Sequence, residues 1–402
     1  MGEPLCCAAL PSATKHSYNR DHRGHGTVNM RVLHIITSLT GGGAERFVAH
    51  LAPTLATQVA HCGVMTIYPT AIPNDVASSD VDVLQISRKG RYEAAFLARM
   101  VSSIRAWRPD VVHTHMKGGT YWGRLTALLA GVPAIVRTEH LPCDVHDRVP
   151  GTALADRFLN ANTTSIVTFF REQAEFLARY ENFNPSKIAV IPNGIKHGPP
   201  PDATAIADGR KRLGVPPGFF SIVVLGNLHR HKNQRLALQA FAAMSADRRR
   251  HSHLYFLGEG DDRIALTAMA HDLGLNENVT FLGFRNDVLR LLPGADLALV
   301  PSTSEGMPLA MIEEMSAGVP IVSTPWLGAK EMLAGGDLGL IAQDWTPSAL
   351  AKGIERVFDE RSAFREKARA VQAYVREEYD IGATARRHVE LYERLLVTPK
   401  VA

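Results

Sequence analysis

The stretch PSTSEGMPLAMIEEMSAGVPIVST, residues 301–324, decides how the whole sequence is interpreted. It follows a short apolar run, DLALV, and contains two carboxylates, Glu305 and Glu313, with seven residues between them. A proline suits the first turn of a helix, and a glycine followed by a proline suits its end. We therefore expect a helix over residues 308–317 that stops before Gly318, with Glu313 about one and a half turns inside it.

The start of this helix is a candidate anion site. Free backbone amides from Gly306 onward and the positive end of the helix dipole both favour negative charge. An ionised carboxylate accepts two hydrogen bonds, so Glu305 and Glu313 suit the neighbouring hydroxyl groups of a ribose or a hexose. The spacing thus predicts a site for a diphosphate with a sugar on each side. It is also compatible with a surface helix whose glutamates, Glu314 included, lie near its positive end.

The composition is that of a globular protein with more than one domain. The chain has 402 residues, of which 46% are hydrophobic and 21% charged. The net charge of +4 suits anionic ligands or membrane surfaces and does not call for nucleic acid. The four cysteines show no metal-ligand spacing and are too few for a disulfide scaffold, which fits a reducing cytoplasm. No apolar run approaches the ~20 residues that a membrane-spanning helix needs.

Strand patterns alternate with helical patterns along most of the chain. We expect residues 1–29 to be a disordered extension, because they are largely polar apart from LCCAAL. The alternation covers residues 30–195, stops in a Pro- and Gly-rich linker at 196–217, and resumes over 218–375. Residues 376–402 contain an amphipathic helix that we expect to pack back toward the N-terminal domain.

The strand patterns also indicate the class of fold. Near-continuous apolar runs such as RVLHIIT at 31–37 and FFSIVVL at 219–225 are typical of parallel strands covered by helices on both faces. We therefore predict an α/β fold of two Rossmann-like, doubly wound domains that face a central cleft. Such sheets bind ligands at the carboxyl ends of their strands, so the residues just after each strand are the candidates for a site.

Several segments together resemble a known family. SEGMPLAMIEEMSAGVPIVST is similar to the E-x7-E segment of family-4-type retaining glycosyltransferases, also called glycosyltransferase group 1, which have the GT-B fold. The segments GGGAER, DVVHTH, VIPNG, LGNLHRHKN, FLGEGDDR and VTFLGF extend the resemblance over most of residues 30–396. It implies a nucleotide-sugar donor in the C-terminal domain, an acceptor in the N-terminal domain, and no metal or cofactor.

The resemblance implies roles for residues of the C-terminal domain. Glu313 matches the residue that binds the nucleotide ribose, Glu305 matches the one near the donor hexose, and Lys232 matches the diphosphate-binding lysine. Further donor contacts are implied at Gly306, Met307, Pro308, Leu309, Gly258, Gly283, Phe284 and Arg285.

One position of the donor site departs from the family pattern. Asn227 stands where the family usually has an arginine that clamps phosphate. We expect Arg230 or Arg235 to compensate, since both follow closely in the same segment. The departure keeps open the alternative that the chain binds nucleotide-sugars without catalysis.

In the N-terminal domain, a glycine run follows the first strand. Gly42 and Gly43 leave room for a ligand to approach the backbone closely, and the alternative is a tight strand-to-helix turn. The run lacks the G-x-G-x-x-G spacing of a nicotinamide site. Arg46, one turn inside the following helix, is a candidate contact for phosphate or acceptor.

Two histidines end the segment DVVHTH. The resemblance implies that His115, the one further toward the carboxyl end, is the active-site histidine, and we expect His113 to be buried. His140, which follows the strand segment VRTE, is a second candidate of the same kind.

The resulting prediction is a retaining, metal-independent hexosyltransferase. It would move a hexose from a nucleotide-diphosphate sugar, a UDP-sugar in preference to GDP-mannose, to a saccharide or lipid-linked acceptor of cell-envelope biosynthesis. We expect it in the cytoplasm, including the inner face of the cytoplasmic membrane, where its basic residues suit peripheral contact with lipid. A sugar-nucleotide epimerase of the same architecture is the alternative enzyme.

Overall fold

The computed structural model describes residues 27–87, 94–140, 153–180 and 183–397. The N-terminal extension, residues 1–29, which we expect to be disordered, lies almost entirely outside these residues. The first strand, β1 (Val28–Ile36), begins two residues before the expected start at Met30, because Val28 pairs with Val59 of the neighbouring strand. No helix among the described residues is both long and apolar enough to span a membrane.

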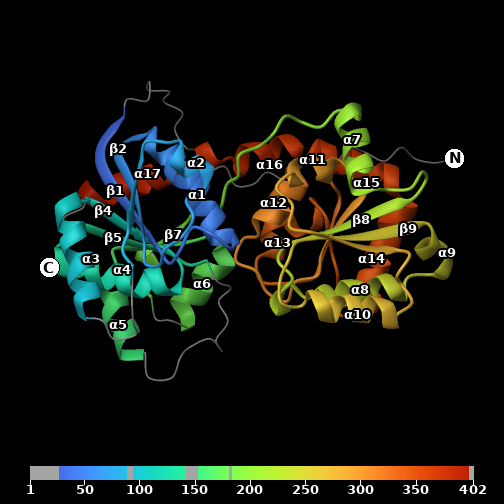
Figure 1. Ribbon diagram of the computed structural model, residues 1–402, viewed down its shortest axis with the longest axis horizontal. Helices are drawn as coiled ribbons and strands as arrows, with labels where there is room; N and C mark the ends of the chain where they lie inside the picture. The colour runs from blue at the N-terminus through green and yellow to red at the C-terminus, as the bar shows by residue number, and fades with distance from the viewer. Residues whose placement is uncertain (1–26, 88–93, 141–152, 181–182, 398–402) are drawn as a thin grey trace.

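The N-terminal domain is built on a seven-stranded parallel sheet in the order β3-β2-β1-β4-β5-β6-β7 (Figure 1). After β1, its strands are β2 (Val59–Thr66), β3 (Val81–Gln85), β4 (Val111–Thr114), β5 (Ala134–Thr138), β6 (Ser165–Thr168) and β7 (Ile188–Val190). Its helices are α1 (Gly43–Ala56), α2 (Asn74–Ala77), α3 (Ala94–Trp107), α4 (Lys117–Ala130), α5 (Ala153–Ala161) and α6 (Arg171–Tyr180). The chain starts in the middle of the sheet and extends it to both edges, which is the doubly wound arrangement.

Side chains of β1 pack on both faces of the sheet, which explains why most of its sequence is apolar. Val32 and Ile36 pack in one cluster with α1, while Leu33 and Ile35 pack in another with α3 and α4. All four are fully buried. Helices therefore cover both faces of this sheet, so a polar side chain of this strand such as His34 needs a hydrogen-bond partner inside the protein.

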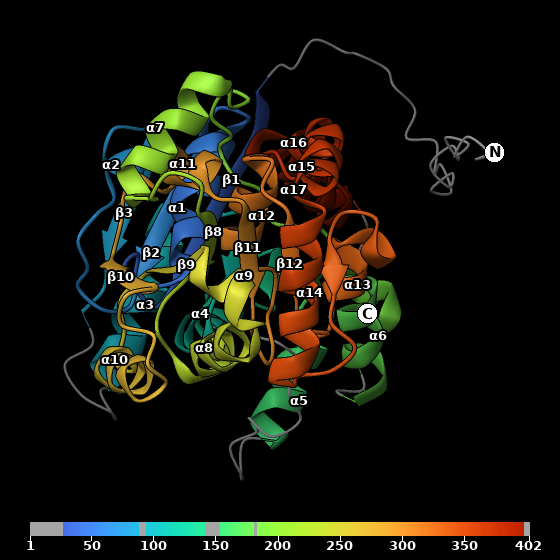
Figure 2. The ribbon, with the colours of Figure 1, turned by 90° about the vertical axis from the view of Figure 1, so that its right-hand side faces the viewer.

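The C-terminal domain repeats the architecture with a six-stranded parallel sheet in the order β10-β9-β8-β11-β12-β13 (Figure 2). Its strands are β8 (Phe220–Leu225), β9 (Ser252–Leu257), β10 (Val279–Gly283), β11 (Leu297–Val300), β12 (Ile321–Ser323) and β13 (Leu340–Ile341). Its helices are α7 (Ala203–Leu213), α8 (Gln234–Ala243), α9 (Ala246–Arg250), α10 (Arg263–Asp272), α11 (Val288–Leu291), α12 (Leu309–Ser316), α13 (Ala329–Met332), α14 (Pro347–Asp359), α15 (Arg361–Ala370) and α16 (Gln372–Glu378). The predicted class of fold, two doubly wound α/β domains, is confirmed.

Part of the segment expected to be an irregular linker is helical. α7 lies within residues 196–217 and packs on α11 and on the 3-10 turn at Leu292–Gly294. Asp202 caps its N-terminus, and a Cβ on Gly209 would lie only 2.6 Å from the backbone nitrogen of Gly294. α7 is therefore packed into the C-terminal domain, and only the residues around it remain as a linker in this segment.

The chain crosses back to the N-terminal domain after α16. The last helix, α17 (Ile381–Val397), packs on α1 and β5 and is the red helix within the left-hand lobe of Figure 1. The hydroxyl group of its Tyr392 lies 2.6 Å from Nδ1 of His113. A parallel bridge between Ile195 and Asp380 joins the two crossings of the chain. The two connections between the domains thus lie side by side.

Candidate active site

A cleft with a volume of about 1550 Å³ lies between the two domains. Its lining comes from segments that follow strands: residues 41–46 after β1, His140 after β5, residues 225–235 after β8 and residues 303–310 after β11. This is the edge at which doubly wound sheets bind ligands. A pocket for one small molecule usually has a volume of ~300–1000 Å³, so the cleft has room for two substrates.

The N-terminus of α12 points into this cleft. The helix begins at Leu309, one residue later than expected, because Pro308 is its N-cap. Gly306, Met307 and Leu309 belong to the cleft lining, and their amides have no hydrogen-bond partner among the described residues. Pro308 has no N–H, so it adds an apolar surface and no amide to the predicted set. Free amides at the positive end of a helix form an anion site.

Close approach of the two domains fixes the position of this anion site. A Cβ on Gly306 would lie 2.2 Å from the carbonyl oxygen of His140, so any other residue there would push the domains apart. Nδ2 of Asn193 donates to the carbonyl oxygen of Met307 over 3.0 Å. Asn193 is not among the predicted site residues, and its only sequence signal is the Asn-Gly pair after a strand segment.

α12 is buried on nearly all sides, so the surface-helix interpretation of its glutamates is wrong. Its apolar side chains belong to the main hydrophobic core. Glu305, Glu313 and Glu314 are all buried as well. Burying a carboxyl group costs free energy unless the group is paired or protonated. Each of the three glutamates therefore needs a partner or a proton.

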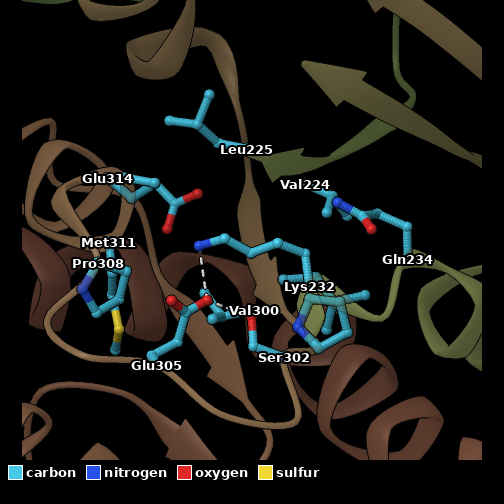
Figure 3. Close-up of a pocket in the computed structure, with 13 residues that line it drawn as sticks. Val224, Leu225, Lys232, Gln234, Val300, Ser302, Glu305, Pro308, Met311 and Glu314 are labelled. Atoms are coloured by element: carbon cyan, nitrogen blue, oxygen red, sulfur yellow. Dashed lines mark hydrogen bonds and ion pairs between the residues drawn. The ribbon is translucent and has the colours of Figure 1, made fainter. Parts of the chain in front are cut away.

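Glu305 has its partner in Lys232 (Figure 3). Nζ of Lys232 lies 2.7 Å from Oε1 of Glu305, and the hydroxyl group of Ser302 donates to the same oxygen over 2.6 Å. An ammonium group has three N–H donors, so this pair leaves donors of Lys232 for an anion. The structure thus brings together Lys232, Glu305 and the N-terminus of α12, as the sequence predicts.

Glu313 has its partner in the opposite domain. Nη2 of Arg46 is hydrogen-bonded to Oε1 of Glu313, and Oε2 is buried without a hydrogen-bond partner among the described residues. Arg46 lines the cleft as predicted, whereas Glu313 lies behind it. A ribose that reaches Glu313 must therefore share this carboxylate with Arg46 or displace the arginine.

Asn227 forms a second contact across the cleft. Its Nδ2 donates to the carbonyl oxygen of Gly41 over 3.1 Å, and Gly41 has a φ of +123° that residues with a side chain rarely adopt. Gly42 and Gly43 line the cleft next to this contact. The glycine run therefore touches the C-terminal domain directly, in addition to turning the chain from β1 into α1.

The loops after β9 and β10 form one end of the cleft. Gly258, Phe284 and Arg285 line it, and the side chain of Phe284 is 74% exposed. Arg285 donates to both carboxylate oxygens of Asp287 over 2.8 and 2.7 Å, which fixes the direction of the guanidinium group. Gly283, which was predicted to contact the donor, does not line the cleft. It is the last residue of β10 and has a φ of +71°. The exposed ring of Phe284 offers a surface on which a flat base can stack.

The placement predicted for His115 is wrong. His115 is fully buried and does not line the cleft, because it is enclosed between β1 and the loop after β5. Its Nε2 lies 2.9 Å from Nδ1 of His34, and its Nδ1 lies 3.0 Å from Nε2 of His140. The histidine that faces the cleft is His140, and His115 contacts it from the interior of the N-terminal domain.

These histidines are neutral at physiological pH. Burial lowers the pKa of His34 and of His140 to about 3, and it lowers the pKa of His115 well below its usual range. A neutral imidazole has one donor and one acceptor nitrogen, so the chain of hydrogen bonds from His34 through His115 fixes the orientation of His140.

His113 is buried, as predicted. Together with His34 and His115 it forms a group of potential metal ligands within the described part of the chain. Both nitrogens of His113 already bond other groups, the hydroxyls of Tyr392 and Thr138, each at 2.6 Å. Both nitrogens of His115 are hydrogen-bonded as well. The chemistry of this cluster is therefore that of a hydrogen-bonded core, and we assign no metal to it.

Comparison with known families agrees with this geometry. Residues 41–199 match the family model described as Glycosyltransferase Family 4, and residues 206–378 match the one described as Glycosyl transferases group 1. The two matches follow each other along the chain and cover the cleft-forming segments of both domains. The chain belongs to the group 1 glycosyltransferases. Their GT-B fold, two Rossmann-like domains around a cleft, is the one described above.

Two curated relatives have named activities. The chain is 30% identical over 226 residues to the UDP-Gal:alpha-D-GlcNAc-diphosphoundecaprenol alpha-1,3-galactosyltransferase of Escherichia coli, a match that covers 53% of this chain and 57% of that relative. It is 26% identical over 322 residues to the 2-deoxystreptamine glucosyltransferase of Streptomyces kanamyceticus, covering 75% of this chain and 82% of that one. This glycosyltransferase thus spans little more than half the length of the first relative.

Solved structures of the same fold include HepE from Anabaena in complex with UDP-glucose. That structure matches with a TM-score of 0.79 at 19% identity, covering 91% of this chain and 100% of HepE. WaaG, a glycosyltransferase involved in lipopolysaccharide biosynthesis, matches with a TM-score of 0.71, also at 19% identity, covering 90% of this chain and 99% of WaaG. These similarities establish the fold of this glycosyltransferase.

Proposed function

We propose that this glycosyltransferase moves a hexose from a UDP-sugar to a saccharide or lipid-linked acceptor, with retention at the anomeric carbon. The main support for the proposal is the preformed anion site at the carboxyl ends of the strands. There Lys232, which is paired with Glu305, lies near the free amides at the N-terminus of α12. UDP in the name of the Escherichia coli relative and UDP-glucose in the HepE complex support the choice of a UDP-sugar over GDP-mannose.

The proposed chemistry follows from where the charge develops. The bond between the anomeric carbon and the donor diphosphate breaks, and the diphosphate leaves with the electron pair. The ammonium group of Lys232 and the amides of Gly306 and Leu309 offset its charge. An acceptor hydroxyl oxygen bonds to the same face of the anomeric carbon and gives its proton to the departing diphosphate oxygen. Glu305 orients the sugar, and the neutral imidazole of His140 faces it from the N-terminal domain.

The setting of the reaction is part of the proposal. The Escherichia coli relative is named for a diphosphoundecaprenol-linked acceptor, which supports a lipid-linked acceptor in envelope polysaccharide or glycolipid synthesis. We place the reaction in the cytoplasm, including the inner face of its membrane, without metal or cofactor. Full activity in the presence of a chelator is the expected result, and loss of activity restored by a divalent cation would contradict it.

A thermal-shift panel of nucleotides and nucleotide-sugars tests the donor first. A ligand that binds the folded state raises its melting temperature, so UDP and UDP-hexoses should raise it more than GDP-mannose does. Product analysis with a bound donor then separates the alternatives. Hexose transfer to an added acceptor supports the proposal, conversion of the donor alone indicates an epimerase, and binding without any turnover indicates a non-catalytic protein.

Loss of a cleft arginine should weaken donor binding, because Asn227 cannot clamp phosphate. Arg230 and Arg235 both line the cleft and are exposed. Replacing the one that contacts the diphosphate with alanine should raise the donor KM about tenfold or more, the loss expected for a hydrogen bond to a charged group. Steady-state kinetics of Arg230→Ala and Arg235→Ala measure it. Unchanged kinetics in both variants would show that neither arginine compensates for Asn227.

Phe284→Ala should weaken nucleotide binding with little effect on turnover. Stacking of a base on an aromatic ring contributes ~1–3 kcal/mol, and we expect the lower end, about fivefold in Kd, because the ring is largely exposed. Titration calorimetry with UDP measures the change. Phe284→Tyr, which keeps the ring, is the matched control. Equal Kd values for the alanine variant and the wild type would place the base elsewhere.

A further inference from the structure

Glu314 is a buried carboxyl group of the donor site that the roles above leave unexplained. Its side chain is 1% exposed, and neither Oε1 nor Oε2 has a hydrogen-bond partner among the described residues. Buried polar atoms in folded proteins are nearly always hydrogen-bonded, so a carboxyl group with two unpartnered oxygens calls for a partner that functions there.

The position of Glu314 indicates that partner. Glu314 lines the same small pocket as Lys232 and Glu305, at the carboxyl ends of β8 and β11. Figure 3 shows its carboxyl group directed toward Nζ of Lys232, with Glu305 on the other side of that nitrogen. Nζ is bonded to Glu305 at 2.7 Å and retains further N–H donors.

We propose that Glu314 is a positioning residue of the donor site, which holds the ammonium group of Lys232 from the side opposite Glu305 as a neutral carboxyl group. The inference rests on the proposed function, because it assumes that Lys232 binds the donor diphosphate. The carbonyl oxygen of a neutral carboxyl group accepts one hydrogen bond from the ammonium group, Glu305 accepts another, and the third donor is then directed at the diphosphate.

The charges around Glu314 explain why its neutral form suits this role. The groups that face it are Glu313 on the same helix, Glu305 in the preceding loop, and Lys232 at the turn before α8. Burial, and then the nearby Glu313, raise the pKa of Glu314 well above its usual range, although Lys232 acts in the opposite direction. An ionised Glu314 would add negative charge beside the diphosphate and weaken its binding.

The sign of the expected pH dependence follows from linkage. A bound anion favours the protonated form of a neighbouring carboxyl group, so affinity for the anion falls as the pH rises through the pKa of that group. Glutamine has a similar shape and cannot ionise. The ratio of Kd in the wild type to Kd in Glu314→Gln should therefore stay near one while Glu314 is neutral and rise once it ionises, and titrations of UDP itself and of other residues cancel in the ratio.

Calorimetric titration with UDP from about pH 6 to about pH 9.5 tests the proposal. A ratio near one at the lower end of this range supports it, and a wild type that binds UDP severalfold more weakly than Glu314→Gln at about pH 6, as an ionised Glu314 would, overturns it. Glu314→Leu, which fills the space without a polar group, should raise Kd about tenfold at pH 7, whereas Glu314→Gln should restore most of the binding. Melting temperatures without UDP verify that the variants are folded, and Glu366→Gln on the exposed surface of α15 is the matched control.

The same titrations separate this inference from the proposed function. If the wild type does not bind UDP, or if Lys232→Ala binds it equally well, the proposed donor site fails and the role of Glu314 fails with it. If UDP binding depends on Lys232 while Glu314→Leu binds UDP as tightly as the wild type, only the role of Glu314 is overturned.

Discussion

Replacing Lys232 with alanine lowers kcat/KM by about 100- to 1000-fold, the largest effect we expect from a single substitution. Among the residues that the structure describes, Lys232 is the one side chain that combines a positive charge, a fixed position on Glu305 and a place beside the free amides of α12. Removing a preorganised donor from a group that becomes more negative in the transition state costs ~2.7–4 kcal/mol. Steady-state kinetics with the donor found by thermal shift measure the loss.

The control for this substitution must separate catalysis from stability. Lys232→Ala leaves the buried carboxylate of Glu305 unpaired, which by itself destabilises a protein. The double variant with Glu305→Gln removes that charge and should still be about 100-fold impaired, because the diphosphate has lost its cation. Lys352→Ala on the exposed face of α14 should behave like the wild type. A Lys232→Ala enzyme within about threefold of the wild type would remove Lys232 from the mechanism.

Glu313→Ala should lower kcat/KM at least about tenfold, because a hydrogen bond to a charged acceptor contributes ~1.5–3 kcal/mol. If Glu313 binds the ribose, the loss should depend on the ribose hydroxyl groups. The wild type should bind UDP more tightly than 2′-deoxy-UDP or 3′-deoxy-UDP, and the variant should lose this preference for at least one of the two. Calorimetric titration of both proteins with the three nucleotides measures the difference.

The pairing with Arg46 makes a further control necessary. Arg46→Ala frees Oε1 of Glu313 without touching a residue of the C-terminal domain. A double-mutant cycle of the two residues gives their coupling free energy, which should differ from zero because they are in direct contact. If Glu313→Ala retains the full preference for UDP over both deoxy-nucleotides, Glu313 serves only the contact with Arg46 and the ribose binds elsewhere.

Much of this architecture could be predicted from the sequence, because a parallel strand covered on both faces needs a near-continuous apolar run. RVLHIIT is such a run, and the structure places its alternate side chains in two separate cores. Glu305 and the start of α12 were predicted from the helix signals after the DLALV strand, and Lys232 from the resemblance to the family. All three lie in segments after strands, which meet at one edge of the sheet.

The direction and pairing of individual side chains could not be predicted. His115 and His140 both follow strands, and only the packing of β1 against β4 decides that the first is enclosed and the second faces the cleft. Arg46 and Glu313 lie 267 residues apart in the sequence, so their contact depends on how closely the domains approach. The burial of Glu314 could not be predicted either. Because α12 packs into the core on nearly all sides, its sequence has no separate polar face that would distinguish a buried glutamate from an exposed one.

A crystal structure of the chain with UDP bound tests the central claim most directly. We predict that the diphosphate lies on Nζ of Lys232 and on the amides of Gly306 and Leu309, with the uracil toward Phe284. Clear density for UDP elsewhere in the cleft, with the Lys232–Glu305 pair and the start of α12 left uncontacted, would contradict it.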